Sequence, residues 1–195
     1  MNRREITRAD IMPLDAYEEV RDERRRTVTA MKRNRRVSVG PDVTFYFENY
    51  DTMWHQIHEM LRIEKGGDAQ IEDELRAYNP LIPDGGNLVA TMMVEIDDPV
   101  RRARVLTELG GVEAAVFLDV GGETVRAVAE TDVERTTEAG KTSSIHFLKF
   151  PFSRATINAF ARPGTRVVLG IDHPKYDHMA ALSDEVRSAL AADFE

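Results

Sequence analysis

Histidines are the side chains of this sequence best suited to bind a metal ion or carry a proton near neutral pH. There are five of them: His55, His58, His146, His173 and His178. His55 and His58 lie one helical turn apart, and Glu59 follows His55 by four residues. Two imidazoles and a carboxylate at this spacing could hold a divalent metal ion. Exposed polar residues on a helix show the same pattern, so both interpretations stay open.

His173 lies in the segment Asp172-His173-Pro174-Lys175-Tyr176. Pro174 restricts the backbone, so we expect the imidazole to be held where a strand ends and a helix begins. There it could act as a base or ligand beside Tyr176. In the alternative interpretation, His173 and Tyr176 form local hydrogen bonds that fasten the C-terminal helix.

His146 shares one face of a predicted strand with Leu148 and Phe150, because side chains alternate along a strand. A histidine on an apolar face is more often a hydrogen-bonded core residue than a ligand. Convergence of His146 with His173 would favour a metal or ligand site.

A polar cluster begins at the end of another predicted strand and continues on the helix that follows. Carboxylate, amide and guanidinium groups together could bind a polar ligand, or they could form internal ion pairs. Its members are Glu48, Asn49, Gln56, Glu59, Arg62 and Glu64.

Common catalytic motifs are missing from the sequence. Without cysteine, the chain has no thiol nucleophile, no disulfide and no iron–sulfur cluster on its own thiolates. Phosphate-loop, dinucleotide and Gly-x-Ser-x-Gly motifs are absent. The segment 58–62 begins like a zinc-protease helix, but Arg62 occupies the position of the second histidine ligand. The sequence does not identify a cofactor, and a divalent metal ion is one that these residues could hold.

Charge is unevenly distributed along the chain, whose net charge is −8. Residues 21–36 contain eight basic and two acidic side chains, whereas residues 37–195 contain 15 basic and 27 acidic ones. The basic segment could dock an anionic partner, or pair with acidic surface of its own body or of a second subunit. Nucleic-acid binding is disfavoured by the acidic remainder. The candidate docking residues are Arg24, Arg25, Arg26, Lys32, Arg33, Arg35 and Arg36.

The periodicity predicts one α+β domain over residues 1–195, with a helical arm (1–36) and a body (37–195). We expect a mostly antiparallel sheet of about six strands with helices packed on it, and a polar N-terminal helix over 13–34. The sparse apolar stripe of this helix needs a surface to cover it, so we expect a homodimer. No signal peptide or membrane span is visible, which predicts a cytoplasmic protein. Predicted strands are 37–39, 43–47, 88–96, 112–120, 123–130, 143–150 and 165–171; further helices are 51–64, 68–78, 98–109, 154–160 and 176–193; residues 131–142 are predicted to form a loop.

Four motifs occur in an order that resembles one bacterial family of unknown function, DUF3501. They are Phe47-Glu48-Asn49, Gln56-Ile57 with Glu59-Met60-Leu61-Arg62 and Glu64, Tyr78-Asn79-Pro80-Leu81, and His173-Pro174-x-Tyr176. The resemblance spans nearly the whole chain, and the helix of residues 56–62 is its most specific part. The family pattern usually has glutamine at the position of His58, which weakens the metal interpretation of the His55–His58 pair.

The resemblance also implies a biological context. Members of the family tend to be encoded beside rubrerythrin-like proteins and an iron–sulfur oxidoreductase that resembles heterodisulfide reductase subunits. The first hypothesis is therefore an accessory protein of a redox or oxidative-stress system that acts by protein–protein interaction. The alternatives are a metal-dependent or ligand-binding enzyme with a site near His173, and nucleic-acid binding through the basic helix.

Overall fold

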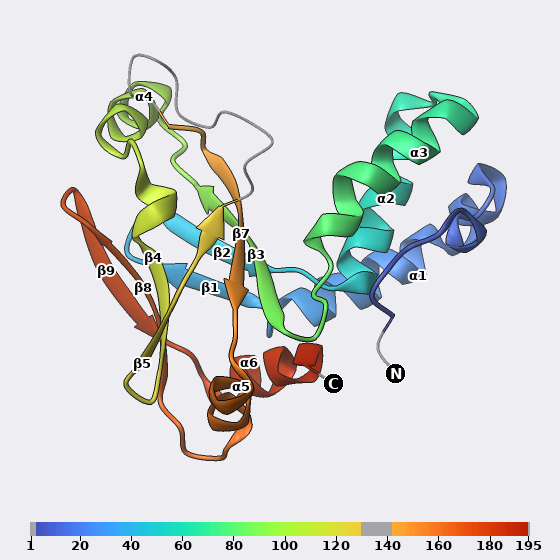
Figure 1. The fold of residues 1–195 in the computed structure, drawn as a ribbon. Coiled ribbons are helices and arrows are strands. Elements are labelled where there is room, and N and C mark those ends of the chain that lie inside the picture. Colours follow the sequence, from blue (N-terminus) through green and yellow to red (C-terminus); the bar gives the residue numbers. More distant parts are fainter. Residues whose placement is uncertain (1–2, 130–141, 195) are drawn as a thin grey trace.

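The computed structural model describes residues 3–129 and 142–194, and it confirms the α+β class with antiparallel strands (Figure 1). The first sheet contains five strands in the order β1-β2-β3-β7-β6. Consecutive partners run antiparallel, and Phe45 of β2 pairs with Val37 of β1 and Met92 of β3. These strands are β1 (Arg36–Val39), β2 (Val43–Phe47), β3 (Asn87–Val94), β6 (Val128–Ala129) and β7 (Ile145–Pro151).

The second sheet contains four strands in the order β5-β4-β8-β9, again antiparallel. Gly121 and Gly122, both with positive φ, form the turn of the β4–β5 hairpin that the glycine pair predicts. These strands are β4 (Val116–Val120), β5 (Glu123–Arg126), β8 (Val167–His173) and β9 (Tyr176–Ala181).

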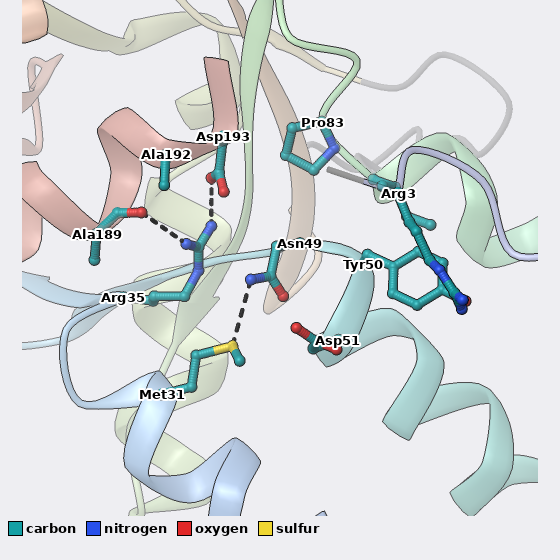
Figure 2. A pocket seen from close by; sticks show the side chains of 11 residues that line it. Arg3, Met31, Arg35, Asn49, Tyr50, Asp51, Pro83, Ala189, Ala192 and Asp193 are labelled. Atoms are coloured by element: carbon teal, nitrogen blue, oxygen red, sulfur yellow. Dashed lines mark hydrogen bonds and ion pairs between the residues drawn. The ribbon is translucent and has the colours of Figure 1, made fainter. Parts of the chain in front are cut away.

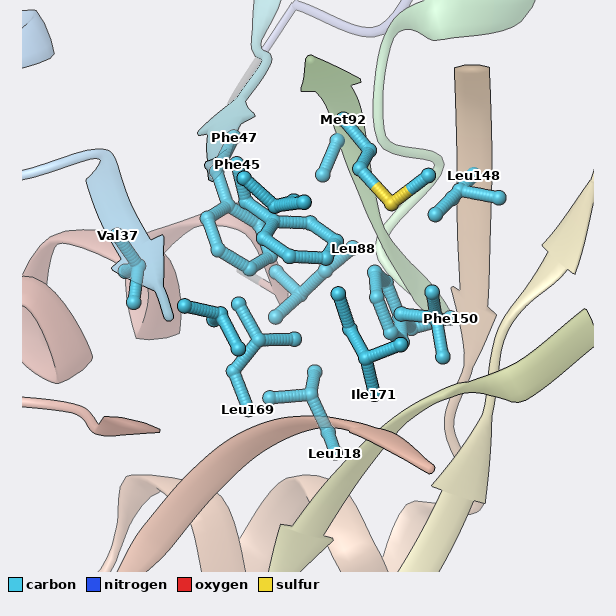
Figure 3. Close-up of a cluster of buried hydrophobic side chains, with 14 of the residues drawn as sticks. Val37, Phe45, Phe47, Leu88, Met92, Leu118, Leu148, Phe150, Leu169 and Ile171 are labelled. Carbon is cyan, nitrogen blue, oxygen red and sulfur yellow. The ribbon is translucent and has the colours of Figure 1, made fainter. Parts of the chain in front are cut away.

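The main hydrophobic core lies between the two sheets (Figure 3). Alternate residues of β2, β3 and β7 point into it from one side, and alternate residues of β4 and β8 from the other. Phe45, Phe150 and Leu169 are fully buried there. The sandwich therefore forms a rigid body on which the helices are placed.

Three helices, α1 (Leu14–Lys32), α2 (Tyr50–Glu64) and α3 (Gly67–Tyr78), form a unit that projects to one side of the sandwich (Figure 1). Asn49 caps α2, because its side chain accepts a hydrogen bond from the backbone of Thr52. A second apolar cluster, which includes Ile57 of α2 and Val89 of β3, joins this unit to the outer face of the first sheet. The α1 helix is thus placed by α2.

Shorter helices cover the ends of the sandwich. They are α4 (Pro99–Glu108), α5 (Arg154–Ala161) and α6 (Asp184–Ala191). Of the one-turn helices, η1 (Arg8–Asp10) and η2 (Asn79–Leu81) contact α3, and the others are η3 (Val112–Ala115) and η4 (Ala192–Phe194). Asp98, Ser153 and Ser183 cap α4, α5 and α6. In the part of the chain that the structure describes, no helix is both long and apolar enough to cross a membrane.

The prediction of one helix over 176–193 is wrong at its start. Residues 176–181 form strand β9, in which His173 pairs with Tyr176 across a two-residue turn. The helix begins only at Asp184. Strand β9 and the division of 123–130 into β5 and β6 add two strands to the seven predicted segments. The loop predicted at 131–142 lies outside the described residues except for Thr142.

Candidate functional site

A hydrogen-bonded network fixes α1 against α2. Arg21 donates from Nε to Glu59 Oε1 (2.8 Å) and from Nη2 to Oε2 (2.9 Å). The Tyr17 hydroxyl donates to the same Oε1 at 2.8 Å and lies 3.0 Å from His55 Nδ1. Since the single hydroxyl proton of Tyr17 goes to the carboxylate, His55 Nδ1 must carry a proton and donate it to the Tyr17 oxygen.

The electrostatics of this network keep Glu59 ionised. Hydrogen bonds from Arg21 and Tyr17 lower the pKa of Glu59 to about 2, although burial opposes the shift. Burial lowers the pKa of His55, and the neighbouring cations reinforce this effect over the pull of Glu59. The predicted ligand Glu59 is therefore already neutralised by a bidentate guanidinium.

His58 is a structural residue in this arrangement. Its Nδ1 lies 2.7 Å from the carbonyl oxygen of Trp54, and its Nε2 accepts the Met12 backbone N–H at 3.0 Å. Its ring also stacks on Trp54 with 3.8 Å between ring centroids. Both nitrogens are occupied, and burial lowers the pKa of His58, so the imidazole is neutral and fixed in one tautomer.

His146 and His173 have different hydrogen-bond partners. The fully buried His146 makes contacts through Nε2 with the Ser143 carbonyl oxygen (2.9 Å) and the Thr142 hydroxyl (3.1 Å). His173 Nδ1 accepts the Lys175 N–H (3.2 Å), and its Nε2 lies 3.3 Å from the Gly110 carbonyl oxygen. His173 therefore stabilises the β8–β9 hairpin turn, and the expected strand-to-helix junction around it is wrong.

Tyr176 fastens the turn between β1 and β2. Its hydroxyl accepts the backbone N–H groups of Asp42 (2.9 Å) and Val43 (3.0 Å) and donates to the Val39 carbonyl (2.8 Å). These three bonds use the whole capacity of a phenol. Burial raises the pKa of Tyr176, so the hydroxyl stays protonated and serves the backbone.

The structure does not gather the predicted polar cluster into one site. Glu48 accepts a hydrogen bond from Thr91 inside the protein, and Asn49 caps α2. Arg62 pairs with Glu18 at 2.6 Å, and Glu64 accepts a hydrogen bond from Gln70 at 2.9 Å. Gln56 lies beside Tyr78 of α3 and opposes the rise in the pKa of Tyr78 that burial causes. Each of these residues is therefore engaged inside the chain, and Gln56 and Glu64 both act at the contact between α2 and α3.

The basic docking residues divide into two classes. Arg35 is only 3% exposed and cannot dock a partner: it binds Asp193 and donates to the backbone carbonyls of Phe47, Glu48 and Ala189. Arg36 pairs with Glu95 at 3.7 Å and lies over the Tyr46 ring. Arg24 lies over the Trp54 ring, 5.1 Å from its centroid. The remaining residues are Arg25 and Arg26 in the middle of α1, and Lys32 and Arg33 at its C-terminal end.

The outer face of α1 points away from the rest of the chain and is rich in charge. A shallow groove on it is lined by Asp22, Arg25, Arg26, Thr29, Ala30 and Arg33, all exposed. Toward the N-terminus, the same helix exposes five acidic residues: Asp15, Glu18, Glu19, Asp22 and Glu23. The sequence interpretation emphasised the arginines and missed this acidic half, although the change of sign between Glu23 and Arg24 is visible in the printed sequence.

A cleft of about 490 Å³ lies where α1, α2 and the C-terminal segment meet (Figure 2). Arg35 and Asp193 close one wall, while Tyr50, Asp51 and Arg3 form the other. Burial raises the pKa of Asp193, and the Arg35 guanidinium opposes the shift. The cleft lies where these three elements meet, and the buried ion pair of Arg35 and Asp193 holds the elements together.

No group of three or more histidine, cysteine, aspartate or glutamate side chains is placed to hold a metal ion among residues 3–129 and 142–194. The candidates are distributed over α2 (His55, His58, Glu59), β7 (His146) and the β8–β9 hairpin (His173, Tyr176). The divalent-metal hypothesis stays an untested prediction.

The chain matches the family described as "Protein of unknown function (DUF3501)" over residues 5–194. It is a member of the DUF3501 family. The match runs from the N-terminal segment through α6, so it includes α1 and both sheets. No match was found among curated proteins.

One solved structure is very similar to this DUF3501 chain. It is the crystal structure of a novel protein of unknown function from Burkholderia pseudomallei K96243, with 40% sequence identity and a TM-score of 0.90. The similarity covers 97% of this chain and 99% of that one. The three-helix unit and the two sheets therefore belong to the shared fold.

Proposed function

We propose that this DUF3501 protein is a non-catalytic accessory protein that binds an acidic surface of another protein through the basic half of α1. The observation that carries the proposal is the group of exposed cations on a helix that its neighbours hold in place. Arg25, Arg26 and Arg33 extend from the surface of α1. The helix itself is fixed to α2 by Tyr17 and Arg21.

Rigid placement favours recognition of a partner. A helix that is fixed before binding loses little conformational entropy when the complex forms. Arginine suits such a surface, because its planar guanidinium forms paired hydrogen bonds with carboxylates. Charges at an exposed interface chiefly increase the association rate, so binding should weaken as salt is added.

The family context suggests which partners to test. Rubrerythrin-like proteins and the iron–sulfur oxidoreductase are the proteins beside which members of the family tend to be encoded. An accessory role in a redox or oxidative-stress system fits a cysteine-free chain, which would assist a cofactor-bearing partner without holding a cluster itself.

A charge-reversal experiment tests the proposal. Binding of each purified candidate partner would be measured by biolayer interferometry for wild type and for Arg25→Glu/Arg33→Glu. The matched control is Arg104→Glu/Arg154→Glu, which makes the same charge change at exposed positions of α4 and α5. We expect the α1 variant to lose at least about tenfold in affinity and the control to keep it. Equal losses in both variants, or no binding by wild type, would refute docking through α1.

Nucleic-acid binding through the same helix has a separate test. Phosphate contacts weaken steeply with salt, so a chain that binds nucleic acid through α1 would be retained on heparin at low salt. The acidic residues Asp22 and Glu23 directly beside the arginines oppose such binding. We expect the protein to pass through the column.

A further inference from the structure

The outer face of α1 carries charges in a pattern that is complementary to itself. Residues 15, 19, 22, 26, 29 and 33 alternate steps of four and three, so they lie along one line of the helix surface. This line is opposite to the face on which Tyr17 and Val28 are buried. Its N-terminal part is acidic, its C-terminal part is basic, and the two parts meet near Arg24.

The helix macrodipole does not explain this arrangement. Acidic residues in the first turn and basic residues in the last turn stabilise a helix, but the effect is lost beyond those turns. Asp22, Glu23, Arg25 and Arg26 lie in the middle of α1. In the described part of the chain, the ion pairs made by α1 are Arg21–Glu59 and Glu18–Arg62. Arg26 Nε also donates to the Asp22 backbone carbonyl one turn earlier at 3.2 Å, so the Asp22 carboxylate and the Arg25 guanidinium carry no ion pair to another element there.

We infer that the protein binds a second copy of itself through this face, with the two α1 helices antiparallel about a two-fold axis near Arg24. In this arrangement Asp15 faces Arg33 of the second copy. Asp22 likewise lies at the level of Arg26 of the second copy. By symmetry each contact occurs twice. A parallel pair would place like charges together, so the charge pattern selects the antiparallel orientation.

The composition of the face also predicts how strong the association is. The face contains no large apolar side chain, and the small residues Thr29 and Ala30 let the two helices approach closely. A 19-residue helix is about 28 Å long, which limits the area that one helix pair can bury. The dimer is therefore reversible and sensitive to salt.

This inference deepens the proposed function and rests on the same arginines. The acidic half of the second copy occupies the basic half that an acidic partner would bind. Self-association and partner binding therefore exclude each other, and the dimer is the form in which the docking face is masked.

Sedimentation equilibrium of the full chain at about 0.1 M and about 1 M salt tests the inference, because the Debye length falls from roughly 10 Å to roughly 3 Å. We expect a concentration-dependent dimer at low salt that dissociates at high salt. Asp22→Arg and Arg26→Asp should each weaken it about tenfold, because two attractive contacts become repulsive. The double variant Asp22→Arg/Arg26→Asp should restore association to within about threefold of wild type. Arg104→Asp on α4 is the control and should change nothing.

Two outcomes would overturn the inference: a monomer at every concentration in low salt, or a double variant no better than the singles. Failure of the proposed function looks different. A chain that dimerises as described but captures neither candidate partner supports the α1 dimer and refutes docking. A chain that stays monomeric and captures a partner through α1 supports docking and refutes the α1 dimer.

Discussion

Replacing Tyr176 by phenylalanine removes one oxygen atom that organises the β1–β2 turn. The loss breaks three hydrogen bonds at 2.8–3.0 Å, all to buried backbone groups. With a net contribution of about 1 kcal/mol for each bond, the free energy of unfolding should fall by about 3 kcal/mol. Phenylalanine keeps the ring and its packing, so the effect isolates the hydroxyl.

Urea denaturation followed by circular dichroism measures this change. For an m-value of about 2.5 kcal/mol/M, the midpoint should shift down by about 1 M with the slope unchanged. The matched control is Tyr46→Phe, because the Tyr46 hydroxyl makes a single bond, to the exposed Glu95 at 2.9 Å. We expect that variant to lose about 0.5 kcal/mol or less. Equal midpoints for the two variants would show that the Tyr176 hydroxyl does not hold the turn, and a role in ligand binding would regain support.

Three further predictions concern the buried and networked charges. Arg35→Ala should lower the free energy of unfolding by about 3–5 kcal/mol in urea titrations, because it leaves the Asp193 carboxylate buried without its partner. Asp193→Asn should lower it by less, and a loss under about 1 kcal/mol for Arg35→Ala would contradict the prediction. Because its pKa is lowered to about 2, ionised Glu59 stabilises the fold above the unfolded pKa near 4.5, and this contribution is lost as the pH falls through about 2. Glu59→Gln should therefore reduce the dependence of the free energy of unfolding on pH at acid pH, and an unchanged dependence would disprove the network. His58→Gln should be tolerated better than His58→Leu by about 1–3 kcal/mol in thermal or urea unfolding, because glutamine can still accept the Met12 N–H; the reverse order would rule out that bond.

Local patterns in the sequence predicted much of the fold. The β4–β5 hairpin and the start of α4 follow from glycine and aspartate at the positions that their turns require. The cap of α2 is Asn49, which the sequence interpretation had placed in the polar cluster instead. Strand β9 was missed because its turn, Pro174-Lys175, lacks the residues typical of a tight hairpin. Its exposed residue Met179 also fits a helical spacing with Val186. Residues 176–181 form a strand because they pair with β8, and this tertiary contact is not visible in the local sequence.

The site was harder to predict, because side-chain partners come from distant parts of the chain. Arg35 lies in a run of basic residues and was interpreted as part of a docking surface. Its partner Asp193 is 158 positions away, so nothing local indicates that it is buried. The hydrogen bonds of His58 and Tyr176 likewise end on remote backbone groups. The sequence therefore shows which polar side chains are present, whereas their hydrogen-bond and ion-pair partners can be identified only from the fold.

The contacts of Arg35 have a consequence for how the protein is made. They connect Arg35, just after α1, to Ala189 and Asp193, which a ribosome produces 154 and 158 residues later. Contacts between such distant positions form slowly and late in folding. During synthesis the pairing of β1, β2 and β3 can form before Asp193 is made, whereas the Arg35 contacts cannot. We expect nascent chains that stop before residue 193 to keep the junction between α1 and β1 loosely held, because the carboxylate that binds Arg35 has not yet been made.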